Sequence, residues 1–312
     1  MEMRLFEYAL EIYKTKSFTK AASHLHIAQP SLSKQIDKLE QELDVYLFHR
    51  KPGYPVEPTP DGFVFVKQAE KILQMRDDLR REILERKEGV RGELKIGSTA
   101  ITGGHILPPL LKIYKEQFPN VCIELIEEST EKLLDLTARG LVDLSILSLP
   151  IEDSRLHTKT MLTEPLYLVL PNEQKQWMPE KVKQIMSSSI LIKQNTLPIE
   201  DFANCPFILL KQGYGFRRTV LELCARGGFG PQIAYETSSI ETAQSLVEHG
   251  LGLTIVPEMG IHRSSYQTSL HYMKLDSNPT RTLVFTYKKE RYLSMNARAL
   301  IEIYEKQANS RY

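Results

Sequence analysis

The chain has 312 residues, of which 42% are hydrophobic and 25% are charged, a composition typical of a globular protein with two or three domains. Its 40 lysines and arginines nearly balance its 39 aspartates and glutamates, and the net charge of +1 excludes nucleic-acid binding through overall basicity. No apolar run approaches the roughly 20 residues that cross a bilayer, and the N-terminal segment lacks the apolar core of a signal peptide. We therefore expect a cytoplasmic protein with no membrane partner.

The three cysteines, Cys122, Cys205 and Cys224, lie far apart and form no C-x-x-C pair, so the sequence predicts neither a zinc site nor a disulfide framework. Each lies in or beside an apolar stretch, which indicates a small buried side chain. The eight histidines are scattered, and the common motifs of serine hydrolases, zinc proteases and phosphate-binding loops are missing. We therefore expect no catalytic residue, no metal site and no enzymatic cofactor.

Three helices are predicted at the N-terminus. In the first, apolar residues recur with helical spacing at Phe6, Ala9, Leu10 and Tyr13. Ser17 and Thr19 have hydroxyls that cap helices, and a short second helix is expected over residues 20–25. A tight turn at residues 26–27 precedes a third helix, whose apolar stripe is formed by Leu32, Ile36, Leu39 and Leu43. This pattern predicts a helix-turn-helix, although a small helical bundle with a solvated face has the same periodicity.

The outward face of the third helix has side chains suited to DNA. Between residues 14 and 38, five lysines are opposed by Asp37 alone. Amides and hydroxyls able to read base edges in the major groove occur at Gln29, Ser31 and Gln35. Groups suited to holding phosphates occur at Thr19, Ser33, Lys34 and Arg50. The predicted DNA-binding set is completed by Pro30 and Lys38.

A wing and a long helix are expected next. Residues 50–59 are rich in proline and glycine, which indicates a β-hairpin, and Arg50 and Lys51 are placed to meet phosphates. Residues 61–87 contain a single glycine, Gly62, and no proline. Their seam has a period near 3.5 and consists of Phe65, Ala69, Ile72, Arg76, Leu79 and Ile83. The pattern fits a coiled coil, or a helix packed on its own chain.

The remaining residues alternate strand-like and helix-like patterns, which predicts α/β units with parallel strands. Strands are expected over residues 94–97, 121–126, 144–147, 207–210 and 253–256. Helices are expected over residues 106–117, 131–139, 216–226 and 240–248, the first of them broken near its start by Pro108 and Pro109. In open α/β sheets, ligands bind at the carboxyl ends of the strands. The hydroxyls that follow the first three strands include Ser98, Thr99, Thr102, Ser129 and Ser148.

A long, ordered set of residues resembles the signature of LysR-type transcriptional regulators. In the first fifty residues the set comprises Ala22, Leu25, Ile27, Gln29, Pro30, Ser31, Ser33, Ile36, Leu39, Glu40, Leu43, Leu47, Phe48 and Arg50. Two positions depart from the pattern. Asp44 replaces the usual glycine after the third helix, so its cap is expected to be reshaped, and Ala28 replaces a capping serine or threonine.

The resemblance extends through the chain in G-E-L-K-I-G at 92–97, A-R-G-L-V-D-L-S-I at 138–146 and V-E-H-G-L-G-L-T-I-V-P at 247–257. It implies an α/β protein with a winged helix-turn-helix (1–60), a linker helix (61–89) and a periplasmic-binding-protein-like effector domain (90–312). Within that domain, subdomain I would comprise about 93–164 and 270–312, and subdomain II about 165–269. The crossing strands would lie at 164–170 and after the approach at 270–274. Residues 174–196 look like an insertion.

The resemblance also implies partners and a ligand. The linker helix would form a homodimer, and the effector domains a homotetramer that binds double-stranded DNA and acts on RNA polymerase. The glycine-rich segment 212–218 resembles a loop that approaches the ligand, which adds Gly213 and Arg217 to the expected effector site. Hydroxyls at a helix start favour a small anionic metabolite. An enzyme, or a ligand-binding protein without DNA function, remains an alternative on the same fold.

Overall fold

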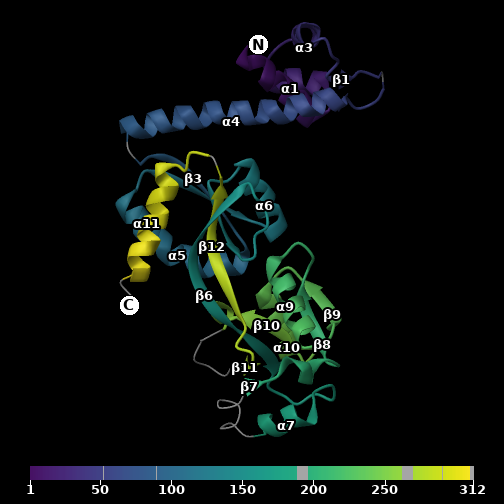
Figure 1. Ribbon diagram of the computed structural model, residues 1–312, viewed down its shortest axis with the longest axis vertical. Coiled ribbons are helices and arrows are strands. Elements are labelled where there is room, and N and C mark those ends of the chain that lie inside the picture. Colours follow the sequence, from purple (N-terminus) through teal and green to yellow (C-terminus); the bar gives the residue numbers. More distant parts are fainter. Residues whose placement is uncertain (52, 89, 188–195, 262–269, 290, 310–312) are drawn as a thin grey trace. The chain divides into compact units, whose positions relative to one another are not determined.

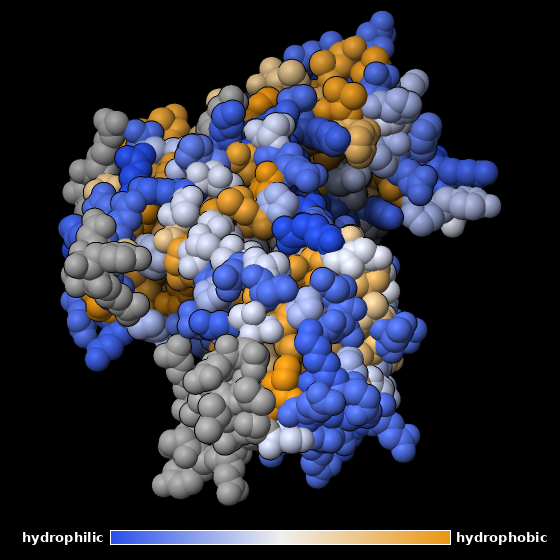
Figure 2. Space-filling view, turned by 60° about the horizontal axis from the view of Figure 1, so that its bottom comes forward, coloured by the Kyte–Doolittle hydropathy of each residue, from blue (hydrophilic) through white to orange (hydrophobic). Residues whose placement is uncertain are grey.

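The computed structural model describes residues 1–51, 53–88, 90–187, 196–261, 270–289 and 291–309. The chain divides into two compact units, residues 1–87 and 88–312. The first is helical and the second is α/β (Figure 1). None of the described helices is both long enough and apolar enough to cross a membrane. On the face drawn in Figure 2, hydrophilic residues cover most of the surface, with hydrophobic residues scattered among them.

The first unit begins with three helices, α1 (Met3–Thr15), α2 (Phe18–His24) and α3 (Gln29–Leu43). Their shared core is formed by Leu5, Ala9, Ile12, Ala21, Ala22, Leu32, Ile36 and Leu39. The Ser17 hydroxyl caps α2 by accepting a hydrogen bond from the Lys20 N–H (3.3 Å). Thr19 therefore lies inside α2, and the expected start of this helix at residue 20 is wrong by two residues.

Both unusual caps of α3 leave the helix intact. Asp44 takes the left-handed conformation at the C-cap (φ 55°), and its N–H donates to the carbonyl of Gln41. The expected reshaping of this cap is therefore wrong, because aspartate tolerates the left-handed region better than most residues. Ala28 provides no side-chain hydrogen bond at the N-cap.

The wing is a two-stranded antiparallel ribbon, β1 (Phe48–His49) and β2 (Glu57–Pro58), in which Phe48 is paired with Pro58. It leads into α4 (Pro60–Glu88), where the Thr59 hydroxyl accepts a hydrogen bond from the Gly62 N–H (2.9 Å). A Cβ on Gly62 would lie 1.8 Å from the Leu47 carbonyl oxygen. The single glycine of the linker helix therefore allows α4 to pass against the chain that enters the wing.

The predicted seam of α4 has two different halves. Its N-terminal part packs on α1, where the rings of Phe65 and Phe6 stack with centroids 5.6 Å apart and Ala69 is fully buried. Farther along, the side chains of Leu79 and Ile83 are 57% and 58% exposed. The first half thus follows the alternative of packing on its own chain, and the second half presents an apolar surface.

The second unit, residues 88–312, contains a mixed sheet with the strand order β4-β3-β5-β12-β6-β11-β7, and β10 also pairs with β6. The first subdomain contributes β3 (Gly92–Ser98), α5 (Ala100–Gln117), β4 (Val121–Glu127), α6 (Thr130–Arg139), β5 (Leu144–Ser148) and α11 (Met295–Asn309). Leu144 and Ile146 of β5 face a core shared with α5 and α11, whereas Ser145 between them bonds to Thr137 of α6 (2.7 Å). The helices therefore cover both faces of the sheet (Figure 1).

Two expectations for this subdomain are corrected. Helix α5 begins at Ala100 and continues through Pro108 and Pro109, so the prolines do not delimit it. Cys122 is exposed on β4, whereas Cys205 and Cys224 are buried as expected. The strand Val121–Glu127 is mostly open to solvent, and its apolar sequence concealed this difference.

Two long strands connect the subdomains. Strand β6 (Leu156–Pro171) pairs with β12 (Thr280–Lys288) through residues 156–165 and with β10 (Thr254–Pro257) and β11 (Leu270–Leu275) through residues 166–171. Residues of β11 belong to the core of the second subdomain, and residues of β12 to that of the first. The chain thus returns to the first subdomain after residue 275, later than the expected boundary at 270.

The second subdomain is built around β8 (Pro206–Leu210). Its other elements are α7 (Glu180–Met186), β7 (Thr196–Leu197), η1 (Ile199–Phe202), α9 (Gly215–Arg226), β9 (Gln232–Thr237), α10 (Ile240–Glu248) and η2 (Glu258–Gly260). The sequence did not predict β9, whose residues are largely exposed. In the expected insertion, Met178 and Val182 join the core and the Trp177 indole donates to the Gly250 carbonyl (3.2 Å), while residues 188–195 lie outside the described part.

Candidate DNA-binding surface and effector cleft

Helix α3 separates a buried stripe from an exposed polar face. Leu32, Ile36 and Leu39 are fully buried. The exposed residues of the predicted set on this helix are Gln29, Pro30, Ser31, Lys34, Gln35 and Lys38. Thr19 on α2 is exposed as well, and Ser33 is half-buried. Among the described residues, no ion pair engages Lys34 or Lys38, so both ammonium groups face solvent and their contact with DNA stays a prediction.

Arg50 differs from the other predicted DNA-binding residues, because it is bound within the protein. Its guanidinium forms ion pairs with Asp37 and Glu40 of α3 and lies 4.9 Å from the centre of the Phe18 ring. Glu40 is only 6% exposed, and its second oxygen accepts hydrogen bonds from the N–H groups at 47 and 48. Arg50 thus joins α3 to the wing, a role that the sequence analysis missed.

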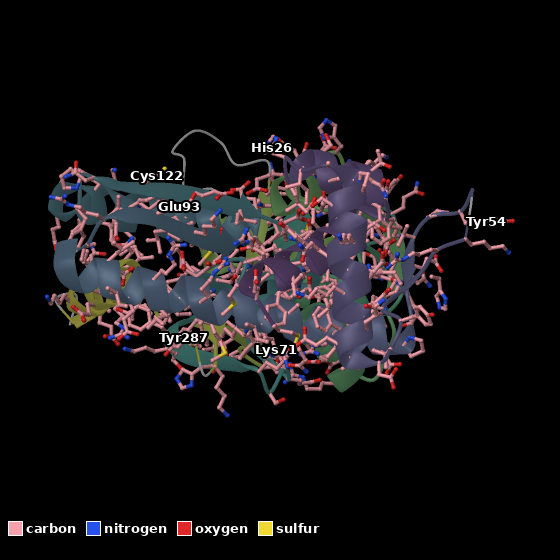
Figure 3. All side chains as sticks on the ribbon, turned by 90° about the horizontal axis from the view of Figure 1, so that it is seen from above. His26, Tyr54, Lys71, Glu93, Cys122 and Tyr287 are labelled. Atoms are coloured by element: carbon pink, nitrogen blue, oxygen red, sulfur yellow. The ribbon has the colours of Figure 1, made fainter. Side chains whose placement is uncertain are left out.

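The wing ends in an exposed aromatic residue. Tyr54 lies at the outer end of the loop and points away from the helices (Figure 3), and its side chain is 64% exposed. The ammonium of Lys51 lies 4.6 Å from the centre of the Tyr54 ring. This pair presents a cation on the loop, and the expected contact of Lys51 with a phosphate stays a prediction.

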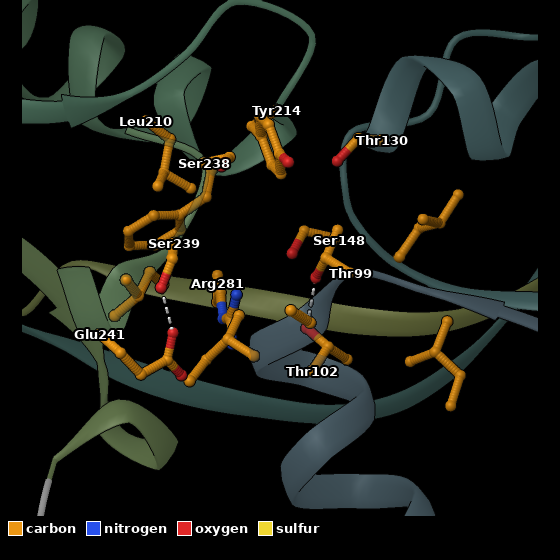
Figure 4. A pocket seen from close by; sticks show the side chains of 16 residues that line it. Thr99, Thr102, Thr130, Ser148, Leu210, Tyr214, Ser238, Ser239, Glu241 and Arg281 are labelled. Atoms are coloured by element: carbon orange, nitrogen blue, oxygen red, sulfur yellow. Dashed lines mark hydrogen bonds between the residues drawn. The ribbon is translucent and has the colours of Figure 1, made fainter. Parts of the chain in front are cut away.

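A pocket lies between the two subdomains of the effector domain (Figure 4). Its polar lining comes from Thr99, Thr102, Thr130, Ser148, Tyr214, Ser238, Ser239, Glu241 and Arg281. Apolar walls are formed by residues that include Ile101, Leu210, Phe216 and Ile240. The empty volume between these residues is about 470 Å³, a figure that includes the open solvent at the mouth of the pocket. Three of the predicted effector residues, Thr99, Thr102 and Ser148, therefore lie together in one pocket.

The N-terminus of α5 opens into this pocket. Thr99 is the N-cap but its side chain makes no capping bond, and its hydroxyl donates instead to the Thr102 hydroxyl (3.2 Å). The first helical hydrogen bond is donated by the Gly103 N–H to the Thr99 carbonyl (2.8 Å). The N–H groups of residues 100–102 precede that bond, and such groups together with the helix dipole favour an anion.

The sequence analysis did not identify Arg281, which lies on the connecting strand β12 at the pocket wall. The Arg281 side chain is 2% exposed, and its Nε donates to Glu164 Oε1 (2.8 Å). Its Nη2 lies 2.7 Å from the same oxygen but has no hydrogen-bond partner among the described residues, and the guanidinium lies 5.3 Å from the centre of the Phe216 ring. Burial lowers the pKa of this guanidinium, and the facing Glu164 carboxylate opposes that fall. Arg281 thus brings a buried cation with an unused donor to the pocket.

The other predicted effector residues lie beside the pocket and do not line it. The Ser98 side chain is buried under α5 and has no hydrogen-bond partner among the described residues. Ser129 caps α6 by accepting from the Lys132 N–H (3.4 Å). Arg217 pairs with Glu236 and donates to the Leu210 carbonyl (2.6 Å), so the structure gives it an intramolecular role.

The segment around Gly213 connects the two subdomains directly. The Gly213 carbonyl accepts a hydrogen bond from the Glu131 N–H (3.0 Å), and the Gly215 N–H donates to the Thr130 hydroxyl (2.9 Å). Gly213 has a positive φ of 87°, which favours glycine at this close approach. Arg218 adds a third link to the carbonyl of Pro150 (3.0 Å). These contacts hold the two walls of the cleft together.

Comparison with known proteins identifies the two units. Residues 3–63 match the profile of the bacterial regulatory helix-turn-helix proteins of the lysR family, and residues 87–309 match that of the LysR substrate binding domain. The chain is 49% identical to the uncharacterised HTH-type transcriptional regulator YcgK of Bacillus subtilis over 306 residues, which cover 97% of this chain and 94% of the relative. Such relatives are transcriptional regulators, so the enzyme alternative is set aside.

Solved structures agree in fold. A full-length variant of OxyR from Pseudomonas aeruginosa is 25% identical, with a TM-score of 0.66 over 98% of this chain and 94% of that chain. The LysR-family regulator CbnR, solved as a complex with its target DNA, is 18% identical with a TM-score of 0.63, covering 98% of this chain and 99% of that one. This chain therefore belongs to the LysR family of transcriptional regulators, with a helix-turn-helix for DNA and a domain for binding an effector.

Proposed function

We propose that this regulator binds a specific sequence of double-stranded DNA and that a small metabolite with a carboxylate, bound in the pocket of the effector domain, alters that binding. One observation carries the second part: the buried guanidinium of Arg281 and the free N–H groups at the start of α5 meet in one pocket. A carboxylate suits both, because it accepts hydrogen bonds from a guanidinium and from helix N-termini.

For DNA, we propose that α3 lies in the major groove. Gln29, Ser31 and Gln35 would read base edges, and Thr19, Lys34 and Lys38 would contact phosphates. The exposure of all six side chains supports this arrangement. A gel-shift assay with genomic fragments identifies the operator, and a triple alanine variant of the three base-reading residues should bind it no better than unrelated DNA. Unchanged operator binding by that variant would show that another surface reads the sequence.

We further propose a homodimer formed through α4 and a homotetramer completed by the effector domains, acting on DNA and RNA polymerase in the cytoplasm. Exposed apolar side chains on the C-terminal half of α4, Met75, Leu79, Ile83 and Leu84, support the dimer. Leu79→Asp with Ile83→Asp should dissociate it, because a carboxylate is costly to bury in an apolar interface. Light scattering tests this, with Lys71→Asp on the same helix as the control.

The effector would act by changing the equilibrium between cleft states. A ligand that touches both walls binds the closed state better, and only this difference in affinity shifts the population. The hydrogen bonds between Gly213 and Glu131 and between Gly215 and Thr130 already favour closure without ligand. Carboxylates should therefore raise the melting temperature of wild type more than that of Thr99→Val. Stabilisation by neutral or cationic compounds alone, equal in both proteins, would refute the carboxylate site.

A further inference from the structure

We propose that the effector is a zwitterion of the α-amino-acid type, whose carboxylate lies at Arg281 and the start of α5 and whose ammonium lies at Glu241. This inference rests on the proposed effector function and narrows its ligand class. It begins from the charges of the pocket. Among the described residues that line the pocket, Arg281 is the single cation and Glu241 the single anion.

The carboxylate end is defined by two independent groups of donors. Helix α5 has 18 residues, and its first N–H groups have no side-chain cap at Thr99. Arg281 approaches from β12 with a guanidinium whose Nη2 has no hydrogen bond among the described residues. An anion bound between them would satisfy a buried donor that is costly to leave unpaired.

The ammonium end is defined by Glu241 in the first turn of α10. Its Oε2 accepts a hydrogen bond from the Ser239 hydroxyl (2.6 Å), which fixes the carboxylate beside the pocket and leaves capacity for further donors. Figure 4 shows Arg281 between Glu241 on one side and Thr99, Thr102 and Ser148 on the other. A ligand that contacts Glu241 at one end and the start of α5 at the other would join the second subdomain to the first.

The charge balance disfavours a simple dianion. Arg281 of β12 is already paired with Glu164 of β6, whose other oxygen accepts a hydrogen bond from the Met259 N–H (2.8 Å), so Glu164 already balances one positive charge at the pocket wall. Glu241 is exposed, and a second carboxylate on the ligand would face it without an added cation, so the two like charges would repel each other. An ammonium at the same place removes that repulsion and gains an ion pair.

The test uses isothermal titration of the full-length chain. The common L-amino acids are first screened by thermal shift, and the best binder is then compared with its 2-hydroxy acid and with its decarboxylated amine. Each analogue should bind about tenfold more weakly, the worth of one charged hydrogen bond. Arg281 is left unchanged, because its removal would leave Glu164 buried without a partner.

Glu241→Gln supplies the decisive variant. This substitution should lower the affinity for the amino acid by about tenfold and leave the affinity for the hydroxy acid unchanged, so that the preference for the amino acid disappears. Glu248→Gln, on the same helix but outside the pocket lining, is the matched control and should behave as wild type.

Four results would overturn the proposal, and they differ in whether the carboxylate site survives. A hydroxy acid that binds wild type as tightly as the amino acid, or a Glu241→Gln variant that retains the preference, overturns the zwitterion and leaves the carboxylate site in place. Binding of simple carboxylates without any binding of amino acids does the same. If neither amino acids nor simple carboxylates bind at millimolar concentration, the zwitterion and the carboxylate effector both fail.

Discussion

Helix α3 and the pocket of the effector domain differ in how the chain builds them. The exposed polar face of α3 comes from one helix, residues 29–38, whereas the pocket draws residues from α5, β5, the loop before α9, the start of α10 and the distant strand β12. A surface on one helix follows from periodicity alone. A pocket assembled by topology depends on where strands end, so its residues are only partly visible in the sequence.

Gly62→Ala is expected to have the largest effect and tests this comparison directly. Although Gly62 lies outside α3, its substitution should abolish DNA binding by the α3 surface. The added methyl would lie 1.8 Å from the Leu47 carbonyl oxygen, which is backbone and cannot move aside cheaply. We expect the free energy of unfolding of the first unit to fall by about 3 kcal/mol. Operator binding should be lost with it. Thermal melting and gel shift measure both effects.

Gly104→Ala is the matched control for that variant. Gly104 also lies in a helix, but nothing stands within 4 Å of the added methyl. This change should stabilise the effector domain by about 0.5 kcal/mol, as alanine does in helix interiors. Equal behaviour of the two variants would show that the approach of α4 to the wing does not constrain residue 62.

Arg50→Ala should have the next largest effect. It tests whether Arg50, a residue of the family signature, contacts DNA or stabilises the fold. Removing the guanidinium leaves Glu40 buried without its partner, which costs about 2 kcal/mol after allowance for the partial exposure of Arg50. Lys51→Ala is the control, since its ammonium contacts only the exposed Tyr54 ring. A residue that only holds phosphate would instead leave stability unchanged and reduce the salt dependence of DNA binding.

Arg50 and Arg281 also show where sequence reasoning ends. The helices, the wing and most α/β elements follow from apolar spacing and turn residues, and Thr99, Thr102 and Ser148 follow from their places after strands. Both arginines acquire their roles from carboxylates distant in sequence, Glu40 on α3 and Glu164 on β6. The sequence also could not show that Arg217 forms an ion pair with Glu236 of β9 and does not line the pocket. No local pattern specifies such pairs.

Within α3, a pair of single substitutions sharpens the division between base and phosphate contacts. Gln29→Ala should cost about 1 kcal/mol on the operator and little on unrelated DNA, because an amide reads base edges. Lys34→Ala should weaken both DNAs alike and lower the salt slope by about one. Titration of both DNAs at several salt concentrations separates the two. Identical profiles for the two variants would contradict the assignment of roles along this helix.

The smallest effect on DNA binding is expected from alkylation of the cysteine thiols. The sequence predicted that all three are buried, and the structure differs at one of them. All three cysteines lie in apolar sequence, yet Cys122 is exposed on β4 and the other two are buried. Burial raises the pKa of the Cys205 and Cys224 thiols to about 11, so almost none of either is thiolate at neutral pH, and the thiolate is the reactive form. Iodoacetamide should therefore label Cys122 in the native protein and the other two only after unfolding, as mass spectrometry can resolve.

DNA binding should survive this labelling, because Cys122 lies outside both the α3 surface and the pocket lining. Rapid native labelling of Cys205 or Cys224 would mean that the second subdomain opens far more readily than its packed core suggests.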